Sequence, residues 1–402
     1  MSDSIGIAVI GAGMAGKAHA AAYRTAPTLF DPVLPKLRYV SIGDVNETLG
    51  AATAKRFGYE RTDSSWQAIV DAPDIDVVSV VVANRLHREI VEALLAAGKH
   101  VLCEKPLSDG LDDARSMAAA AANASSIARV GFTFRRTPGI AAIRELIQNG
   151  TLGRVLHFSG RYWTDYASDP QGPMSWRFKG GAGSGALADV GSHLAYVAEF
   201  LAGDIQSVNG GRLATEISRR PLPIGTVIGH DHAEVSDVYE DVENDDYAGF
   251  SAQFANGVGQ LEVSRVAAGH ANSLTFEVFC ENGSAVFDQR RPAEIGLFLS
   301  GGSSVTNGFR QVILGPGHPY LSGGLPMDAP SVGFGQNDAF AYQARAFLDE
   351  VAGIDGGLPT NATFEDGVHN MEILAAATRS AENGGASVDV ARFETAEKEL
   401  AR

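Results

Sequence analysis

Cysteine is scarce in this chain, since Cys103 and Cys280 are the only two among 402 residues. Two cysteines do not build the disulfide framework of a small secreted domain, and the apolar run around Cys103 favours a packed thiol over a nucleophile. Long apolar runs are missing as well, because none approaches the roughly 20 residues of a membrane span. Basic residues are few, 32 against 48 acidic ones, and the net charge of −16 argues against nucleic acid or an anionic membrane surface as the main partner.

The residues that are present indicate a soluble globular protein. Hydrophobic residues make up 45% of the chain and charged residues 20%, and a chain of this length favours two domains over a single core. The opening stretch "MSDSIGIAVIGAG" enters an apolar run without the basic region of a secretory signal. We therefore expect a cytoplasmic protein.

The first third of the chain alternates apolar runs with helical patterns. The runs are continuously apolar, which is typical of parallel strands covered on both faces. Strands are expected at 5–10, 37–43, 75–83, 100–104 and 127–134, and helices at 47–57, 87–98 and 112–124. Strands that alternate with helices predict an α/β fold with a doubly wound parallel sheet of the Rossmann type.

The pattern changes after residue 135, where a helical pattern ends at Gly150 and strand patterns then come in neighbouring pairs. Asn256–Gly257 and Asn282–Gly283 each lie between two such runs, which is the strongest short signal of a hairpin. A helix over 337–353 is expected to pack against this sheet. We predict a Rossmann domain at 1–135 and, at 136–402, an α/β domain with a large, mainly antiparallel open sheet.

One stretch of this second half is strongly acidic, with eight acidic residues in the run Asp231–Asp246. A run of one charge is usually solvated, so we expect an exposed loop. The sequence His230-Asp231-His232 at its start has residue types that bind metals, but its place in this run favours the same solvated interpretation.

The hexapeptide "GAGMAG" (Gly11–Gly16) fits G-x-G-x-x-G between an expected strand and an expected helix. Glycine is needed there because a pyrophosphate must approach bare backbone at the positive end of a helix. The alternative is that the glycines only make a tight turn. An acidic residue, Asp44, ends the second expected strand, and its carboxylate can accept both hydroxyls of the adenosine ribose. Neither Val45 nor Asn46 would neutralise a 2′-phosphate, so we expect NAD rather than NADP as the cofactor.

Asp189 and His193 lie four residues apart in "ALADVGSH", directly after the glycine-rich run "KGGAGSG". This spacing puts both side chains on one face of a helix, and an apolar stripe of Leu194, Val197, Ala198 and Leu201 supports a helix. Such a pair suits proton transfer, but a helix cap with a core histidine is the alternative for isolated residues. A zinc pair is a further alternative, although no third ligand is apparent, and we expect no metal.

Four stretches together resemble the Gfo/Idh/MocA family of sugar and cyclitol dehydrogenases. They are "GAGMAGKAHAAAY", "VVANRLHREIVEALLAAGKHVLCEKPLS", "GFTFRRTPGIAAIRELIQNGTLG" and "GAGSGALADVGSHLAYVAEFLAG". The resemblance implies a Rossmann domain followed by an α/β domain whose open sheet forms a homodimer or homotetramer. It matches the family's catalytic lysine to Lys105 in "CEKP" and its catalytic Asp and His to Asp189 and His193.

The resemblance also implies which residues contact the cofactor. These are Gly11, Gly13, Met14, Ala15, Gly16, Asp44, Val82, Asn84, His87, Glu104 and Lys105. Relatives often read T-P-N-x-x-H after the third strand, whereas here the residues are Val82-Ala83-Asn84-Arg85-Leu86-His87. Asn84 and His87 are kept, and the threonine and proline are missing.

The chemistry of alcohol oxidation fits these residues. Removing a hydride and a hydroxyl proton requires a base at the hydroxyl and a cation near the oxygen. Histidine, with an ordinary pKa of about 6.5, can accept the proton near neutral pH. We hypothesise that His193 is the general base, that Asp189 orients the substrate or assists the proton relay, and that Lys105 stabilises the reacting oxygen. Which of Asp189 and His193 takes the proton first stays open.

The segment Gly160–Gly181 has the aromatic and hydrogen-bonding side chains that suit a sugar ring. Trp176 has a core alternative, and the glycines of "KGGAGSG" are interpreted as room for the ring. The predicted substrate contacts are Lys105, Arg135, Tyr162, Trp163, Asp165, Trp176, Arg177, Asp189, His193 and His318.

Together these observations predict an NAD-dependent dehydrogenase that oxidises a secondary hydroxyl of a cyclic polyol or pyranose. The segment "GFRQVILGPGHPY" resembles members that handle inositols, levoglucosan or the 3-hydroxyl of a sugar. One rival is a glycoside-cleaving relative that oxidises transiently with bound NAD. A rival of another class is a sugar sensor that binds the dinucleotide without turnover.

Overall fold

The computed structural model describes residues 4–225, 233–302, 305–318 and 320–391. The sequence His230-Asp231-His232 lies outside the described residues. The described chain forms two compact units, one of Met1–Arg136 with Gly315–Val368 and one of Thr137–Leu314 with His369–Arg392. The domain division at 135/136 stays a prediction, and each unit is described here by itself.

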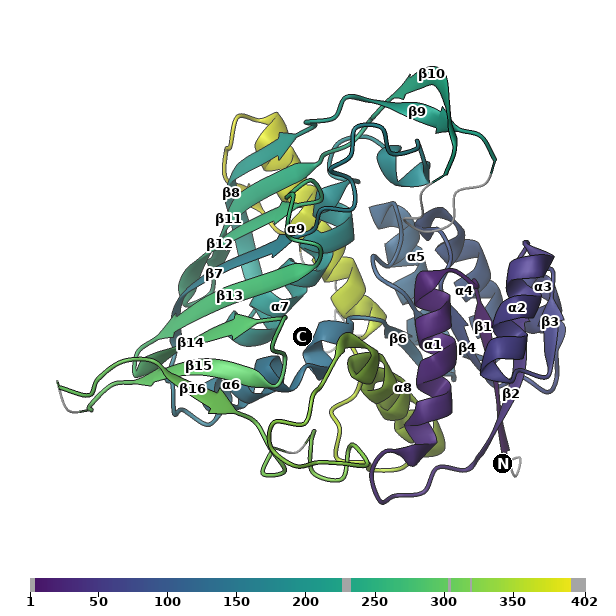
Figure 1. The fold of residues 1–402 in the computed structure, drawn as a ribbon, viewed down its shortest axis with the longest axis horizontal. Helices are drawn as coiled ribbons and strands as arrows, with labels where there is room; N and C mark the ends of the chain where they lie inside the picture. Colours follow the sequence, from purple (N-terminus) through teal and green to yellow (C-terminus); the bar gives the residue numbers. More distant parts are fainter. Residues whose placement is uncertain (1–3, 226–232, 303–304, 319, 392–402) are drawn as a thin grey trace. The chain divides into compact units, whose positions relative to one another are not determined.

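The first unit contains a parallel six-stranded sheet in the order β3-β2-β1-β4-β5-β6, as the Rossmann pattern predicts (Figure 1). Its strands are β1 (Ser4–Ile10), β2 (Lys36–Gly43), β3 (Arg61–Asp63), β4 (Val77–Val80), β5 (His100–Cys103) and β6 (Ala128–Val130). Its helices are α1 (Met14–Thr25), α2 (Glu47–Phe57), α3 (Trp66–Asp71), α4 (His87–Ala96), α5 (Leu111–Asn123) and α8 (Gln336–Ala352), with short 3₁₀ turns η1 (Ala26–Thr28), η2 (Asn84–Leu86) and η3 (Thr133–Arg136).

The apolar runs explain the centre of this sheet. Ile7, Val9 and Val77 are fully buried, because helices cover both faces of the central strands. The five predicted strands are present, although β4 and β6 are shorter than the predicted 75–83 and 127–134, since the chain forms the turn η3 from Thr133 onward. Strand β3 was missed, since its three residues are polar and carry no apolar pattern.

Helix α8 lies in the first unit, so the expectation that the helix over 337–353 packs against the antiparallel sheet was wrong. Ala344, Phe347 and Leu348 join the same buried cluster as Ile7 and Tyr23. The predicted helix itself is confirmed, but helical periodicity states only that one face is apolar. It does not state which sheet or helix that face will meet.

The second unit contains a nine-stranded, mainly antiparallel sheet in the order β16-β15-β14-β13-β7-β12-β11-β8-β17, with α7 and α9 on one of its faces (Figure 1). The strands are β7 (Val155–Trp163), β8 (Ile205–Ala214), β11 (Tyr247–Phe254), β12 (Gly257–Ser264), β13 (Ser273–Cys280), β14 (Gly283–Asp288), β15 (Glu294–Leu299), β16 (Arg310–Ile313) and β17 (Val388–Asp389). A separate ribbon pairs β9 (Arg219–Pro223) with β10 (Val235–Asp241).

The helical elements of this unit are α6 (Pro138–Gln148), η4 (Trp176–Phe178), the π-helix η5 (Leu187–Gly191), α7 (Ser192–Ala202) and most of α9 (Phe364–Glu382). The apolar stripe predicted on α7 is confirmed, since Leu194, Val197, Ala198 and Leu201 are all buried. Within the described residues, no helix combines the length and the apolar character needed to cross a membrane.

Both predicted hairpins are present, but each turn lies one residue earlier than the Asn-Gly pair suggests. Phe254 pairs with Gly257, and Cys280 pairs with Gly283, so each glycine is the first residue of its second strand. A Cβ on Gly257 would lie 2.8 Å from the carbonyl oxygen of Leu156, and one on Gly283 would lie 2.2 Å from that of Phe298. The glycines are therefore needed for close approach to a neighbouring chain segment.

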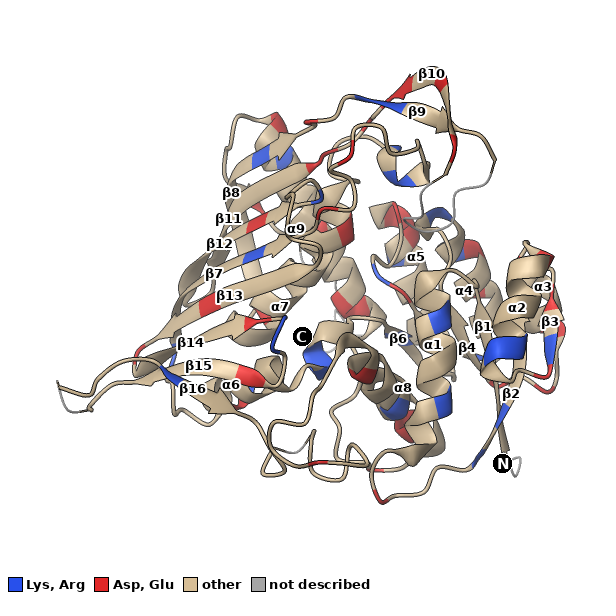
Figure 2. Ribbon diagram, in the orientation of Figure 1, with Lys and Arg blue, Asp and Glu red and all other residues tan. Residues whose placement is uncertain are grey.

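The acidic run is only partly the solvated loop that its composition predicts. Figure 2 shows acidic residues along β10, whose side chains are largely exposed. The end of the run is different, because Asn244, Asp245 and Asp246 are only 1%, 2% and 0% exposed. For these three residues the expectation of a solvated loop was wrong, and their hydrogen bonds give the reason.

Candidate functional site

The loop Gly11–Gly16 has the geometry that a dinucleotide pyrophosphate needs. Gly11 has φ +106°, and a Cβ there would lie 2.1 Å from the carbonyl oxygen of Val81, so only glycine fits this turn. A Cβ on Gly16 would lie 1.8 Å from the carbonyl oxygen of Gly11, which explains the close packing of α1 on the loop. A Cβ on Gly13 would have nothing within 4 Å, so the backbone here is open to a ligand at the start of α1. Met14 next to it is 66% exposed.

Asp44 follows β2 and lies beside this loop. One carboxylate oxygen accepts a hydrogen bond from the backbone N–H of Ala12 at 2.7 Å, and the other accepts one from Asn46 at 2.8 Å. These two bonds fix the carboxylate next to the fingerprint glycines. The residues of this half-site therefore fit NAD, with Asp44 in the place where a ribose-binding carboxylate belongs.

Lys105 follows β5 next to a buried carboxylate, Glu104. One oxygen of Glu104 is 2.8 Å from His19 Nε2, and the other accepts the backbone N–H of Lys105 at 3.2 Å. Burial raises the pKa of Glu104, but the hydrogen bond from His19 and the charges of His19 and Lys105 lower it below its ordinary value. Gly131 is needed here, since a Cβ would lie 2.7 Å from the Glu104 carboxylate.

The remaining predicted cofactor residues of this unit lie in η2 and the segment before it. Val82 and Asn84 are partly exposed, whereas His87 is fully buried. His87 Nε2 lies 3.1 Å from the carbonyl oxygen of Val82, and its Nδ1 lies 3.1 Å from that of Leu107. Burial lowers the pKa of His87. This side chain therefore links the loop after β4 to the segment that follows Lys105.

Cys103 precedes this segment and is fully buried. Burial raises its pKa well above the ordinary value, so the thiol stays protonated. The expectation of a packed thiol is confirmed.

In the second unit, Asp189 lies in the π-helical turn η5, directly before α7. Its Oδ2 accepts a hydrogen bond from the Tyr166 hydroxyl at 2.9 Å. Asp189 does not cap this helix. That role belongs to Asp245, whose carboxylate accepts the backbone N–H of Gly185 at 3.1 Å and that of Leu187 at 2.8 Å. The alternative of a mere helix cap at Asp189 is thereby removed.

His193 lies in the first turn of α7 and is partly exposed. The Tyr162 ring stands 6.0 Å from the His193 ring. The Tyr162 hydroxyl donates to Asn272 Oδ1 at 2.7 Å, and burial, followed by the charge of Asp189, raises the pKa of Tyr162 above its usual range. The structure thus brings Tyr162 together with Asp189 and His193.

Trp163 is the last residue of β7, and Asp165 follows the strand. Successive side chains of a strand point to opposite faces, so Trp163 and Tyr162 face opposite sides. The Trp163 ring lies 4.6 Å from the Arg161 guanidinium and 4.9 Å from the His270 ring. Asp165 accepts the backbone N–H of Gly269 at 3.2 Å. Both residues therefore contact the loop that connects β12 to β13.

Trp176 is 53% exposed, so its core alternative is excluded. The Arg177 guanidinium lies 4.5 Å from the centre of the Trp176 ring, and both residues belong to η4. The backbone of Arg177 is fixed, because its carbonyl oxygen accepts hydrogen bonds from Asn244 and Arg265, each at 3.0 Å. The side chains of Trp176 and Arg177 can therefore contact a ligand bound to the second unit.

Arg135 and His318 belong to the first unit, whereas the substrate-contact candidates from Tyr162 to His193 belong to the second. Arg135 lies in η3 and is partly exposed. His318 is 8% exposed, its Nδ1 accepts the backbone N–H of Tyr320 at 3.2 Å, and burial lowers its pKa to about 4. This histidine is therefore neutral across the physiological range.

Two of the four glycines of "KGGAGSG" serve packing, and the interpretation of this run as room for a ring stays a prediction. A Cβ on Gly183 would lie 2.1 Å from the Thr378 hydroxyl, and one on Gly185 would lie 2.1 Å from the carbonyl oxygen of Asp245. The space beside these two glycines is filled by the protein itself, whereas a Cβ on Gly181 would meet nothing within 4 Å.

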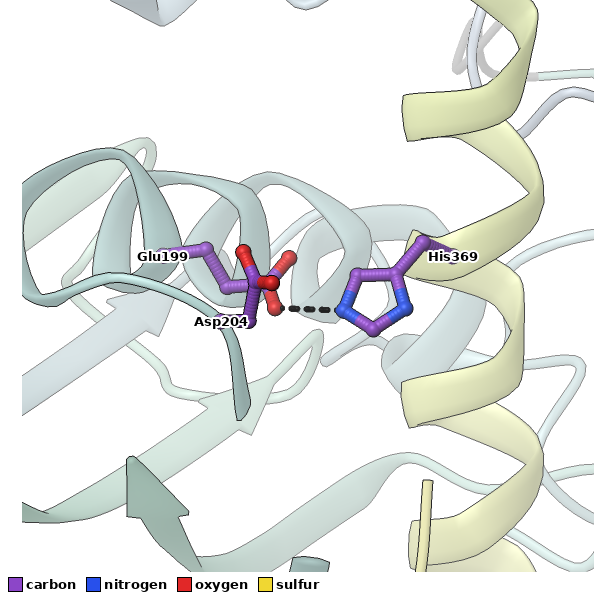
Figure 3. A group of neighbouring side chains, drawn as sticks. All are labelled: Glu199, Asp204 and His369. Atoms are coloured by element: carbon purple, nitrogen blue, oxygen red, sulfur yellow. Dashed lines mark hydrogen bonds and ion pairs between the residues drawn. The ribbon is translucent and has the colours of Figure 1, made fainter. Parts of the chain in front are cut away.

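A cluster of possible metal ligands lies in the second unit, where Glu199, Asp204 and His369 place one ligand atom each within 4.8 Å of one another (Figure 3). His369 Nε2 is 2.8 Å from a Glu199 oxygen, and the ring also bonds the backbone of Ala391. Burial lowers the pKa of His369, but the hydrogen bond and charge of Glu199 together with Asp204 raise it above its ordinary value. The contact of His369 Nε2 with Glu199 is an ion pair when the imidazole is protonated, and the same three ligand atoms lie close enough together to hold a metal ion.

Sequence reasoning missed His19, Tyr166 and Asp245. His19 stands in the quoted stretch "GKAHAAAY", and Tyr166 stands in the segment Gly160–Gly181, yet neither spacing indicates its partner. Asp245 was hidden by the acidic residues around it. Its only sequence signal is its position two residues before a strand.

Comparison with known proteins identifies relatives of both units. A family model described as "Oxidoreductase family, NAD-binding Rossmann fold" matches residues 5–132, and the "GFO/IDH/MocA C-terminal domain" model matches residues 140–286. Levoglucosan dehydrogenase of Pseudarthrobacter phenanthrenivorans is 37% identical over 375 residues, which cover 91% of this chain and 93% of that protein. D-glucoside 3-dehydrogenase of Escherichia coli is 31% identical over 214 residues, which cover 52% of this chain and 57% of that protein.

Solved structures give the same result. Levoglucosan dehydrogenase in complex with NADH and levoglucosan is similar with a TM-score of 0.87 and 35% identity, covering 97% of this chain and all of that one (100%). The complex with NADH and L-sorbose has a TM-score of 0.88 and 34% identity over the same shares. With the fingerprint loop, Asp44 and both family domains in place, the chain belongs to the Gfo/Idh/MocA family of NAD-dependent oxidoreductases.

Proposed function

We propose that this enzyme oxidises a secondary hydroxyl of a pyranose sugar or cyclic polyol, and that a levoglucosan-type anhydrosugar or the 3-hydroxyl of a glycoside is its substrate. The observation that carries the proposal is the similarity to levoglucosan dehydrogenase over 91% of the chain. Many oxidoreductases share the dinucleotide-binding unit, so similarity in that unit alone would not indicate a substrate. The similarity to levoglucosan dehydrogenase also includes the second unit, and this supports a related substrate.

The proposed roles follow from the chemistry of the residues. His193 accepts the hydroxyl proton, and Asp189 orients the substrate hydroxyl or passes the proton on. Lys105 stabilises negative charge on the reacting oxygen. The proposal requires that the two units present these residues to one hydroxyl group. The NAD held by Gly11–Gly16 and Asp44 supplies the acceptor for the hydride.

The proposed substrate contacts divide by unit. In the second unit, Tyr162 lies beside the His193 ring, and Arg177 with Trp176 offers a planar donor group and an exposed aromatic face. Arg135, Trp163, Asp165 and His318 remain proposed contacts, and Trp163, Asp165 and His318 also contact other parts of the protein.

We also propose that the enzyme assembles as a homodimer or homotetramer through the sheet face that α7 and α9 leave uncovered. Val258 is 52% exposed and pairs with His157, whose ring stacks on the Phe279 ring of the neighbouring strand at 4.2 Å. Exposed apolar side chains on a sheet favour association. Measuring the mass in solution tests this, and a monomer at micromolar concentration would contradict it.

An NAD-reduction screen over levoglucosan, inositols, hexoses and glycosides tests the proposed function. Net NADH formation from an anhydrosugar or free pyranose is expected. Cleavage of a glycoside without net NADH would favour transient oxidation instead. Tight NAD binding with no reduction over the whole panel would favour the sugar sensor.

A further inference from the structure

We infer that Tyr166 is a positioning residue for Asp189, and that the buried Asp246–Arg265 ion pair holds Tyr166 and the helix carrying Asp189 in register. This inference rests on the proposed function, because it assigns how Asp189 is aimed in that reaction. Every residue involved lies in the second unit.

The contact between Tyr166 and Asp189 is direct. The Tyr166 hydroxyl donates to Asp189 Oδ2 at 2.9 Å. Burial, followed by the charge of Asp189, raises the pKa of Tyr166 well above its ordinary value, so the phenol keeps its proton and remains a donor. A hydrogen bond to an ionised carboxylate is stronger than one between neutral groups, and it fixes the direction of the carboxylate.

Tyr166 is itself held by a packed cluster. Its ring contacts the buried cluster of Ala167, Met174 and Phe178. The next residue, Ala167, donates its backbone N–H to the carbonyl oxygen of Arg265 at 3.0 Å. The position of Tyr166 is therefore set by the backbone of Arg265.

The helical turn η5, which contains Asp189, is held by Asp245. Asp245 accepts the backbone N–H groups of Gly185 and Leu187, and its own carbonyl oxygen accepts that of Ala186 at 2.8 Å. Three successive N–H groups at the start of η5 are thus bound by one residue. Gly185 is required, because any Cβ would meet the Asp245 carbonyl oxygen at 2.1 Å.

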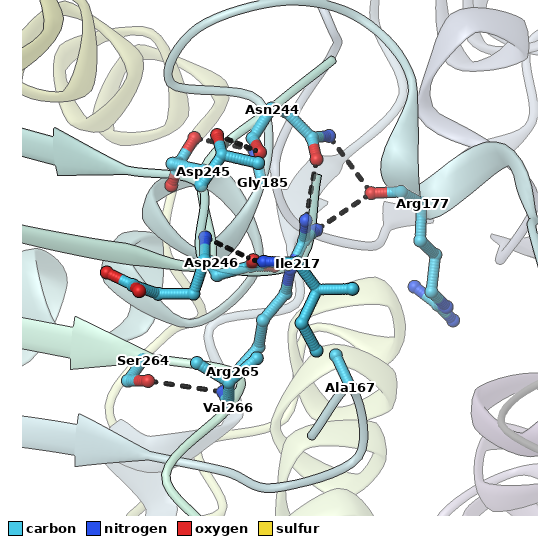
Figure 4. A network of polar contacts seen from close by, with 12 residues as sticks. Ala167, Arg177, Gly185, Ile217, Asn244, Asp245, Asp246, Ser264, Arg265 and Val266 are labelled. Carbon is cyan, nitrogen blue, oxygen red and sulfur yellow. Dashed lines mark hydrogen bonds and ion pairs between the residues drawn. The ribbon is translucent and has the colours of Figure 1, made fainter. Parts of the chain in front are cut away.

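The contacts of Tyr166 lead to Arg265 and those of η5 lead to Asp245, and the ion pair between Arg265 and Asp246 connects the two (Figure 4). Asp246, next to Asp245, accepts Arg265 Nε at 2.7 Å, and the two side chains are 0% and 1% exposed. The other Asp246 oxygen accepts the backbone N–H groups of Glu216 and Ile217, each at 2.9 Å. Arg265 also donates to Asn244 Oδ1 at 2.7 Å. Asp189 is thus connected through Tyr166 to Arg265, and through η5 and Asp245 to Asp246.

Replacing Tyr166→Phe tests the assignment, since the ring that packs in the cluster is kept and only the hydroxyl is lost. We expect kcat to fall about 10- to 100-fold, the loss that one hydrogen bond to a charged group implies, with KM for the sugar and Kd for NAD nearly unchanged. In an Asp189→Ala background the same replacement should change kcat by less than about 2-fold, because Tyr166 would have nothing to position. Tyr247→Phe is the matched control, since its hydroxyl bonds Glu262 at 3.0 Å on the sheet.

Two results would overturn the inference. One is a wild-type kcat in Tyr166→Phe. The other is an equal loss in both backgrounds, which would mean that the hydroxyl acts independently of Asp189. If the wild-type enzyme turns over no sugar, the proposed function fails, and a double-mutant cycle on unfolding stability then decides the inference. Coupling between Tyr166→Phe and Asp189→Ala supports it, and additivity overturns it.

Discussion

Replacing Asp246→Asn should destabilise the second unit by about 3–5 kcal/mol, the usual cost of breaking one side of a buried ion pair. The residue is 0% exposed, and its two oxygens accept Arg265 on one side and two backbone N–H groups on the other. Asparagine offers a single oxygen. In either orientation its NH₂ group therefore faces donors, and Arg265 loses its counter-charge inside the protein.

The measurement is urea unfolding followed by tryptophan fluorescence. Of the three tryptophans, Trp66 lies in the first unit, while Trp163 and Trp176 lie in the second, so a Trp66→Phe background reports on the second unit alone. Asp241→Asn is the control, since Asp241 is 83% exposed in its pair with Arg219 and should change stability by less than about 0.5 kcal/mol. A loss below about 1 kcal/mol in Asp246→Asn would refute the reasoning.

Two further predictions concern the cofactor and pH. Asp44→Ala should reduce the preference for NAD over NADP about 10- to 100-fold, as expected for lost bonds between a carboxylate and ribose hydroxyls. The variant also loses the hydrogen bond between Asp44 and Ala12, but this loss affects the Kd of NAD and the Kd of NADP alike, so their ratio is unaffected by it. An unchanged ratio would show that Asp44 does not bind the ribose. His369→Gln should cost about 1 kcal/mol of stability at pH 6, and less as the pH rises to 9. The pKa of His369 is raised in the folded protein. Its contribution to the free energy of unfolding is therefore complete below the ordinary pKa of histidine, and it is lost as the pH rises through the pKa of the folded state. A difference that is independent of pH would contradict a protonated His369.

Much of the fold was predictable because apolar periodicity reports on burial. The central strands of the first unit and the hairpins of the second followed from such patterns, and so did the stripe on α7. The glycine fingerprint was predictable for a similar reason, since close backbone approach leaves only glycine. These signals are local, and one stretch of sequence contains each of them.

The remainder depends on contacts between distant residues. Tyr166 bonds Asp189 across 23 positions, and Arg265 bonds Asp246 across 19. Composition made Asp245 and Asp246 resemble the exposed acids before them, although backbone N–H groups and an arginine compensate their burial. Helix α8 showed an apolar face, but only the tertiary structure identifies α1 and its neighbours as the partner of that face.

The initial rate of NADH formation from levoglucosan, compared between the wild type, Lys105→Ala and His193→Ala, tests the central claim most directly. The account predicts turnover by the wild type and a rate about 10²- to 10⁴-fold lower in each variant, the usual contribution of an acid–base group for His193 and of a charge-stabilising group for Lys105, with NAD binding retained. Near-normal rates in either variant would contradict the assignment of the site.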